Sequence, residues 1–315
     1  MVLSTQLTTH PHIAAEVIRS GGIVAFPTET VYGLGADIFN KSAIEKIFEA
    51  KQRPPDNPLI AHVSSLNQMT LLTNEVTDNA KSLVDAFFPG PLTVVLKRSA
   101  RVPYAATAGL DTIGIRMPEH SLARRFLAAC GTPVAAPSAN LSGRPSPTTW
   151  QAVLEDLNGR IDCILQGDPT DIGLESTVVD CTVDPPLLLR KGAVSIEELR
   201  RVVAGTRADE VNGQEDIRSP GLRHRHYTPS AKIILVEPDL IRADTANSAY
   251  IGLVPPVWDV GKRVICGSVE DYAQQMFEFF RECDRLGIEK IYCQMVDEVG
   301  IGSALMDRLR RAASA

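Results

Sequence analysis

The chain lacks the short motifs of several common enzyme classes. It contains no Gly-x-x-x-x-Gly-Lys-[Ser/Thr] sequence, so a Walker-type phosphate loop is not predicted. It contains neither His-Glu-x-x-His nor Gly-x-Ser-x-Gly, and the stretches GLGADIF and GIGSALM lack the third glycine of a dinucleotide fingerprint. If the chain is an enzyme, we therefore expect neither a protein metal centre nor a standard side-chain nucleophile.

The cysteines are few and scattered, and no two of them form a Cys-x-x-Cys pair. This spacing argues against a zinc ribbon or a thioredoxin-type site. Each lies in or beside an apolar run, so we expect small buried side chains in a reducing compartment. The six are Cys130, Cys163, Cys181, Cys266, Cys283 and Cys293.

Long apolar segments are also lacking. The N-terminus has no basic start followed by an apolar stretch, so no signal peptide is predicted. No apolar run approaches the roughly 18 residues of a membrane span. We expect a cytoplasmic protein that does not enter a membrane.

The overall composition is that of a globular protein. The 315 residues are 44% hydrophobic and 22% charged, with a net charge of −6. This length suits two domains with a full core. The acidic balance argues against a surface that binds nucleic acid as a whole, but it leaves room for a local basic pocket.

Strand-like and helix-like segments alternate along the chain, which predicts the α/β class. Two helices carry capping boxes in the sequence: Ser42 with Glu45 at the start of helix 42–51, and Ser195 with Glu198 further on. The polar, Pro- and Gly-bearing residues 207–230 read as a linker. We therefore expect domains at 1–206 and 231–315.

The stretch KQRPPDNPLI places Lys51 and Arg53 at the end of the helix predicted over 42–51. Cations in a last helical turn favour the negative end of the helix dipole, and the two prolines stop the helix. The same cations could instead hold an anion. This segment alone leaves both interpretations open.

Polar runs also follow or precede several predicted strands. At such positions α/β folds commonly bind ligands, although turns with hydroxyl caps and plain surface loops have the same composition. The runs are FPTETVYGLG with Thr28, Glu29 and Thr30; PSANLSGRPSPTT with Ser138, Asn140, Ser142 and Ser146; GLESTVVD with Glu175, Ser176 and Thr177; and LLLRKGAVS with Arg190 and Lys191.

Taken together and in order, these motifs resemble a known family. FPTETVYGLG, KQRPPDNPLI, TIGIRMP, APSANLSGRPSPT, LESTVVD and LRKGAVS resemble the YrdC-like domain of threonylcarbamoyl-AMP synthases. SPGLRHRHYTP, the strand-rich tail and GIGSALMDRLRRAA resemble the two-domain members of that family. The chain departs from the family pattern at Leu222 and His224, where Met and Tyr are expected, and its tail domain is shorter than usual.

The resemblance implies a twisted mixed sheet around a concave, electropositive cavity, with a smaller Rossmann-like α/β domain at the C-terminus. It also implies a reaction in which L-threonine, bicarbonate and ATP give threonylcarbamoyl-adenylate and pyrophosphate. The product would supply a separate tRNA threonylcarbamoyl transferase, and direct contact with tRNA is left open. An N-carboxylate of threonine would itself be the nucleophile, and Mg²⁺ would arrive with the triphosphate rather than in a protein cage.

The resemblance also assigns residues by matching position. Lys51 and Arg53 would hold anions during catalysis. Threonine binding falls to Thr30, His62, Arg116, Ser138 and Ser176. ATP binding falls to Arg53, Asn57, Thr112, Asn140, Thr148 and Arg190, with Lys51 alongside. Arg225, His226 and Tyr227 of the linker would close over the nucleotide as a lid.

Two alternatives remain. A YrdC-like cavity could bind RNA without forming an adenylate, and the linker has a local basic and aromatic cluster; acidic net charge counts against this. A related carbamoyl-adenylate enzyme of hydrogenase maturation is the other alternative. Such proteins normally carry zinc-finger and acyl-phosphatase modules that this sequence lacks.

Overall fold

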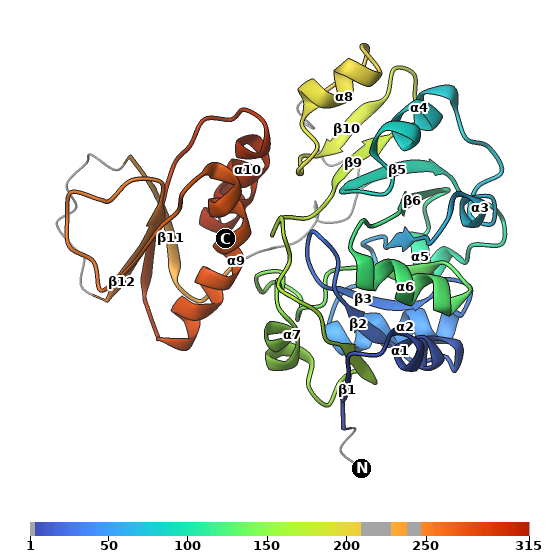
Figure 1. Cartoon of the computed structure of the whole chain (residues 1–315), viewed down its shortest axis with the longest axis horizontal. Helices are drawn as coiled ribbons and strands as arrows, with labels where there is room; N and C mark the ends of the chain where they lie inside the picture. The colour runs from blue at the N-terminus through green and yellow to red at the C-terminus, as the bar shows by residue number, and fades with distance from the viewer. Residues whose placement is uncertain (1–3, 209–227, 238–246, 315) are drawn as a thin grey trace.

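The computed structural model describes residues 4–208, 228–237 and 247–314, and these form two α/β units (Figure 1). The first unit contains a ten-stranded mixed sheet in the order β1-β8-β2-β3-β7-β4-β6-β5-β9-β10. The strands are β1 (Gln6–Thr8), β2 (Val24–Phe26), β3 (Gly33–Asp37), β4 (Ile60–His62), β5 (Leu92–Lys97), β6 (Thr112–Arg116), β7 (Val134–Ala136), β8 (Cys163–Leu165), β9 (Thr177–Asp180) and β10 (Leu187–Arg190).

Helices cover both faces of this sheet. They are α1 (Pro11–Arg19), α2 (Lys41–Lys51), α3 (Leu66–Met69), α4 (Asp78–Phe87), α5 (Tyr104–Thr107), α6 (Ser121–Cys130), α7 (Trp150–Leu157) and α8 (Ile196–Val202). In β2, Val24 and Phe26 pack with α1 and α6, while Ala25 packs in the cluster that contains α2. Successive strand residues point to opposite faces, so full burial of β2 requires a helix layer on each side.

One predicted capping box is present and the other is wrong. Ser195 and Glu198 exchange both capping hydrogen bonds, at 2.8 and 3.2 Å. Helix α2 instead begins after Asn40, whose Oδ1 accepts a hydrogen bond from the amide of Ala43 at 3.1 Å. Asn is as good an N-cap as Ser, and here it stands two residues earlier. Ser42 therefore lies inside the helix.

The second unit is smaller and has a four-stranded sheet in the order β11-β14-β12-β13, with every pairing parallel. Its elements are β11 (Lys232–Val236), β12 (Ser248–Gly252), β13 (Lys262–Ile265), β14 (Lys290–Gln294), α9 (Val269–Arg285) and α10 (Ile301–Ala313). The fold is thus α/β throughout, with a large mixed sheet and a second small parallel sheet. Most of the predicted linker, 207–230, lies outside the described residues.

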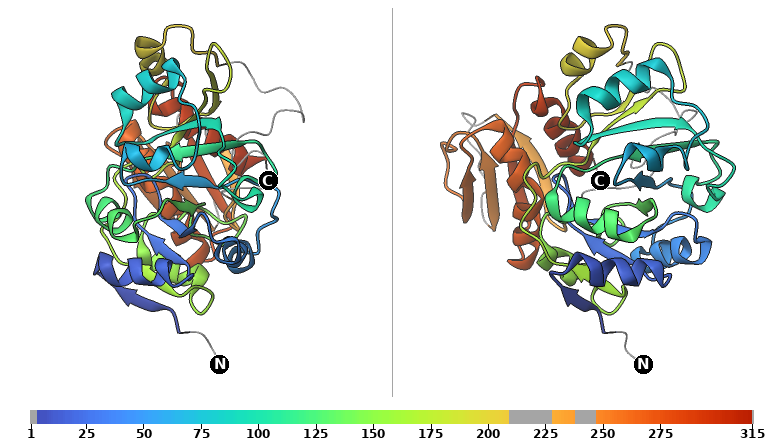
Figure 2. Two further views of the ribbon diagram at one scale, coloured as in Figure 1. Left: turned by 90° about the vertical axis from the view of Figure 1, so that its right-hand side faces the viewer. Right: turned by 45° about the vertical axis from the view of Figure 1, so that its right-hand side comes forward.

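Helices α9 and α10 lie between the small sheet and the large unit, as Figures 1 and 2 show. Val31 and Leu174 of the large unit belong to the same apolar cluster as Met276 and Phe277 of α9. The backbones also approach closely at Gly173, where φ is 78° and a Cβ atom would lie 2.5 Å from the Cα of Gln274. The two units therefore share a packed apolar interface.

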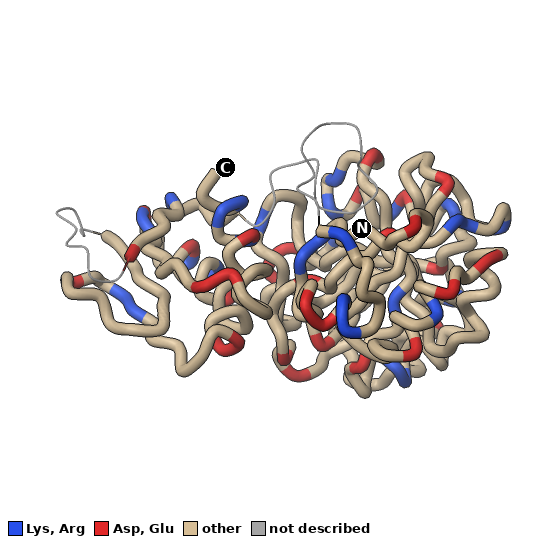
Figure 3. Tube along the Cα trace, turned by 90° about the horizontal axis from the view of Figure 1, so that it is seen from above, with Lys and Arg blue, Asp and Glu red and all other residues tan. Residues whose placement is uncertain are grey.

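The cysteines agree with a further expectation from the sequence. All six cysteines are buried and unpaired, as the sequence predicts. Lysine and arginine are interspersed with aspartate and glutamate along both units (Figure 3). In the part of the chain that the structure describes, no helix is both long enough and apolar enough to cross a membrane.

Candidate functional site

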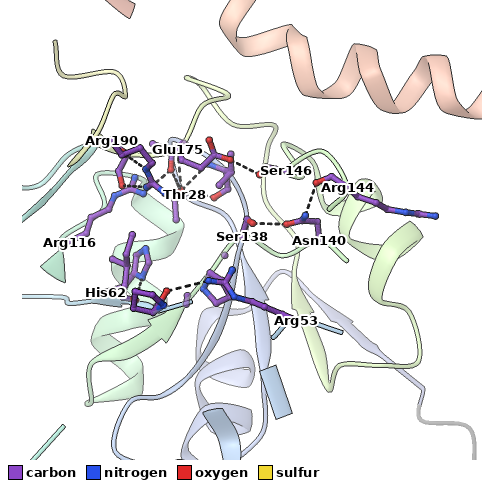
Figure 4. A pocket seen from close by; sticks show the side chains of 18 residues that line it. Thr28, Arg53, His62, Arg116, Ser138, Asn140, Arg144, Ser146, Glu175 and Arg190 are labelled. Atoms are coloured by element: carbon purple, nitrogen blue, oxygen red, sulfur yellow. Dashed lines mark hydrogen bonds between the residues drawn. The ribbon is translucent and has the colours of Figure 1, made fainter. Parts of the chain in front are cut away.

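A cavity of about 670 Å³, counting its open mouth, lies where several strands of the large sheet end. Its wall is assembled from the turn after β2, the segment after α2, strands β4 and β6, the loop after β7, and the residues before β9 and at the end of β10 (Figure 4). The lining residues are Thr28, Thr30, Val31, Gly33, Arg53, Pro58, Ile60, His62, Arg116, Ala136, Pro137, Ser138, Asn140, Arg144, Ser146, Glu175, Ser176 and Arg190.

Arg116, at the end of β6, is fixed by the turn after β2. Its Nη1 donates to the Oγ1 of Thr30 at 2.8 Å, and its Nη2 lies 2.6 Å from the Oε1 of Glu29. Burial raises the pKa of Glu29, but the charge and hydrogen bond of Arg116 outweigh this and hold it below its usual value. The pair is therefore ionised, and it orients a guanidinium in the cavity wall.

His62, at the end of β4, is a neutral imidazole. Its Nδ1 lies 3.1 Å from the carbonyl oxygen of Ile60, and its ring meets the ring of Phe26 edge-on at 5.6 Å. Burial, followed by the charge of Arg116, lowers its pKa from 6.5 to about 3. His62 therefore offers a hydrogen-bonding group to the cavity without a charge.

The loop after β7 is held by its own side chains and by Lys51. Ser138 Oγ donates to Asn140 Oδ1 at 2.6 Å, and Asn140 Nδ2 donates to the carbonyls of Leu141 and Arg144, both at 2.8 Å. Lys51 Nζ donates to the carbonyls of Ser138 and Asn140, both at 2.5 Å. The Ser-x-Asn motif thus forms a rigid turn over the lysine.

Lys51 is buried, at 1% exposure, and it is not one of the residues that line the cavity. Burial, and then the nearby charge of Arg53, lower its pKa well below the usual value. Helix α2 ends at Lys51, with Gln52 in the left-handed conformation as the C-cap, so the predicted helix end is confirmed. Arg53, by contrast, lines the cavity and donates to the carbonyls of Asn57 and Pro58 at 3.1 and 3.3 Å.

The opposite wall is built around Ser176, just before β9. Its Oγ lies 2.8 Å from the Oγ1 of Thr93, and Arg190 donates to its carbonyl at 3.0 Å and to its Oγ at 3.1 Å. The neighbouring Glu175 accepts a hydrogen bond from Ser146 Oγ at 2.5 Å. In Figure 4, Arg116, Glu175 and Arg190 gather on one side of the cavity and Arg53 lies across from them.

The structure brings together most of the site residues proposed from the sequence. Thr30, Arg53, His62, Arg116, Ser138, Asn140, Ser176 and Arg190 all line the cavity. Lys51, Asn57, Thr112 and Thr148 do not line it. Arg225, His226 and Tyr227 lie outside the described residues.

Three of the four site residues that do not line the cavity can be placed as follows. Asn57 and Thr148 are buried, at 1% and 3% exposure. Thr112 is half-buried at the start of β6, and it lines a separate hollow with Arg98 and Asp111.

Four polar lining residues were not assigned roles from the sequence: Thr28, Arg144, Ser146 and Glu175. All four lie within the polar runs next to strands, so the runs themselves were the signal. Within the described residues, no group of three or more His, Cys, Asp or Glu side chains could hold a metal ion.

Comparison with known proteins covers nearly the whole chain. Residues 16–192 match the family model Sua5_yciO_yrdC, described as "Telomere recombination", and residues 194–314 match Sua5_C, described as "Threonylcarbamoyl-AMP synthase, C-terminal domain". The threonylcarbamoyl-AMP synthase of Pyrococcus abyssi is 44% identical, over 95% of this chain and 93% of the relative. That of Bacillus subtilis is 40% identical, over 97% of this chain and 94% of the relative.

A solved structure agrees with these matches. The crystal structure of P. abyssi Sua5 complexed with L-threonine has a TM-score of 0.91 to this chain and is 40% identical. The alignment covers 100% of this chain and 98% of that one. The chain therefore belongs to the threonylcarbamoyl-AMP synthase family, in its two-domain form.

Proposed function

We propose that the protein joins L-threonine, bicarbonate and ATP into threonylcarbamoyl-AMP and releases pyrophosphate. One observation carries the proposal: a single cavity is lined by eight of the residues that the family resemblance assigns to threonine and ATP. Four arginines line this cavity together with five hydroxyl-bearing side chains. Such a wall suits two anionic substrates and a small hydroxylated amino acid.

Threonine would be held on the side of Arg116. A guanidinium matches a carboxylate with two parallel hydrogen bonds, and Glu29 and Thr30 fix Arg116 in place for this. The amine and hydroxyl groups of the amino acid would form hydrogen bonds with the side chains of Thr30, Ser138, Ser176 and the neutral His62. The P. abyssi relative described as complexed with L-threonine supports threonine as a ligand.

ATP would be held by Arg53, Asn140 and Arg190, which line the cavity. Lys51 would act on the nucleotide site by holding the Ser-x-Asn turn through the carbonyls of Ser138 and Asn140. We keep Asn57, Thr112 and Thr148 as further ATP contacts, and Arg225, His226 and Tyr227 as a lid. Mg²⁺ would enter as part of the ATP substrate.

The chemistry needs positioning more than a protein nucleophile. The threonine amine and bicarbonate give an N-carboxylate and one water molecule. One oxygen of the N-carboxylate then attacks the α-phosphorus while the bond to pyrophosphate breaks. Held together, the two reactants gain the advantage of an intramolecular reaction. The fixed donors of Arg53 and Arg190 would stabilise the charge that develops on the phosphate oxygens.

The product is a mixed anhydride, so a separate transferase that moves the threonylcarbamoyl group to tRNA is the expected partner. We place the reaction in the cytoplasm, which fits the six buried, unpaired cysteines.

Pyrophosphate release tests the function. The complete mixture should release pyrophosphate, and omitting threonine, bicarbonate or ATP in turn should stop it. An Arg116→Met variant should lose most of the threonine-dependent release, because the threonine carboxylate loses its partner. Release that ignores threonine would refute the proposal. Salt-dependent RNA binding without any turnover would instead favour an RNA-binding module.

A further inference from the structure

Arg308 of the C-terminal unit reaches the wall of the cavity. It lies on α10 and is only 1% exposed. Its Nε donates to the Oε2 of Glu175 at 2.8 Å, and its Nη2 donates to the carbonyl of Lys191 at 3.0 Å. Arg308, from a helix of the C-terminal unit, thus binds Glu175, whose carboxylate lines the cavity.

Glu175 is engaged on both of its oxygens. Oε1 accepts from Ser146 and Oε2 accepts from Arg308. Burial raises its pKa, but the charges of Arg308 and then Arg190, with the two hydrogen bonds, hold it below its usual value. Glu175 is therefore a charged carboxylate in the wall of a cavity otherwise suited to anions.

A buried carboxylate without a cation nearby is strongly unfavourable. For Glu175, the two arginines whose charges lower the pKa are Arg308 and then Arg190. In the structure Arg190 donates to the carbonyl and hydroxyl of Ser176. If Arg308 were absent, Glu175 would compete for Arg190 and would repel a triphosphate.

We infer that Arg308 is a positioning residue of the active site: it neutralises Glu175 so that Arg190 stays on Ser176, where it can bind the nucleotide. This inference rests on the proposed function, which assigns Arg190 to ATP. It gives the C-terminal unit a direct part in building the ATP site.

A single variant and a double variant test the inference. Arg308→Met removes the cation and keeps much of the volume, and adding Glu175→Gln removes the carboxylate that it compensates. ATP affinity is measured by calorimetry on the full chain, without turnover. Arg308→Met should bind ATP about tenfold more weakly, the loss of one charge-assisted contact. The double variant should regain most of that loss.

Arg310→Met is the matched control. Arg310 lies on the same helix, and its exposed side chain pairs with Glu298. It should bind ATP as the wild type does. KM for ATP should rise in Arg308→Met more than kcat falls.

Three outcomes would overturn the inference. The first is unchanged ATP affinity in Arg308→Met. The second is a double variant that binds more weakly than either single variant, as purely structural damage predicts. The third is a wild-type protein that does not bind ATP. A wild type that binds ATP but releases no pyrophosphate with threonine would refute the proposed reaction, while the affinity comparison would still decide the role of Arg308.

Discussion

Arg281 of α9 binds Asp156 of α7 across the interface through both terminal nitrogens. Nη1 lies 3.2 Å from Oδ1 and Nη2 lies 2.8 Å from Oδ2, and the side chains are 4% and 0% exposed. Nη2 also donates to the carbonyl of Pro145, while Asp156 accepts from the amide of Leu141. The C-terminal unit therefore holds both ends of the loop that contributes Arg144 and Ser146 to the cavity.

Arg281→Met should destabilise the protein and loosen this loop. Breaking a buried ion pair by removing one partner costs roughly 3–5 kcal/mol when the other charge is left without a cation. Asp156 keeps its second partner, Arg144, at 2.8 Å, so we expect a loss near the lower end, about 3 kcal/mol. Urea unfolding measures this loss. Arg285→Met, which removes a half-exposed arginine bound to Glu155 and Glu278, should cost less than about 1 kcal/mol. Equal losses in the two variants would contradict the role given to Arg281.

His62 should make the protein less stable in mild acid. Its pKa is about 3 in the folded chain against an ordinary value of 6.5, so the unfolded chain takes up a proton first as the pH falls. Stability is therefore lost as the pH falls from 6.5 toward 3. Between about pH 7 and about pH 5 the share of His62 is roughly 2 kcal/mol.

His62→Asn removes this share, so its unfolding free energy should depend less on pH than that of the wild type. His12 is exposed, and His12→Asn serves as the control for replacing a histidine by asparagine. If the unfolding free energies of the wild type and His62→Asn fall by the same amount as the pH is lowered, His62 does not cause the loss of stability in acid.

Lys51 and Arg53 should differ in what their loss does. Lys51→Met leaves two buried carbonyls, on Ser138 and Asn140, without this donor, so we expect a stability loss of about 1–3 kcal/mol together with lost activity. Arg53→Met removes a half-buried side chain that lines the cavity, so activity should collapse while the melting temperature moves little. Thermal melts and pyrophosphate assays on both variants decide this. If Arg53→Met loses stability while Lys51→Met loses only activity, the roles given to the two residues are wrong.

The site should prefer threonine strongly over valine. Thr30, Ser138 and Ser176 line the cavity with hydroxyl groups, and a site built to hydrogen-bond a substrate hydroxyl rejects the analogue without it by up to about 10⁴-fold. The ratio of kcat/KM for the two amino acids measures this preference. Comparable values would show that the hydroxyl is not read.

Local patterns in the sequence were sufficient to predict the α/β class, the helix end at Lys51 and the polar runs that supply part of the cavity wall. Each depends on residues close together in the chain, such as strand periodicity or a polar run after a strand. The roles of His62 and Arg116 came from the family resemblance and not from a local pattern. The start of α2 was missed because Asn40 and Ser42 are both good N-caps and packing decides between them. The contact of Arg308 with Glu175 joins residues 133 positions apart, so nothing near either residue could reveal it.

The most direct test of the account is to identify the product. The protein is incubated with ATP, L-threonine and isotope-labelled bicarbonate, and the nucleotide fraction is analysed at once by mass spectrometry. We predict a threonylcarbamoyl-adenylate whose mass carries the bicarbonate label, formed in step with pyrophosphate. If pyrophosphate appears with AMP alone, or the adenylate forms without the label even at the earliest times, the account is contradicted.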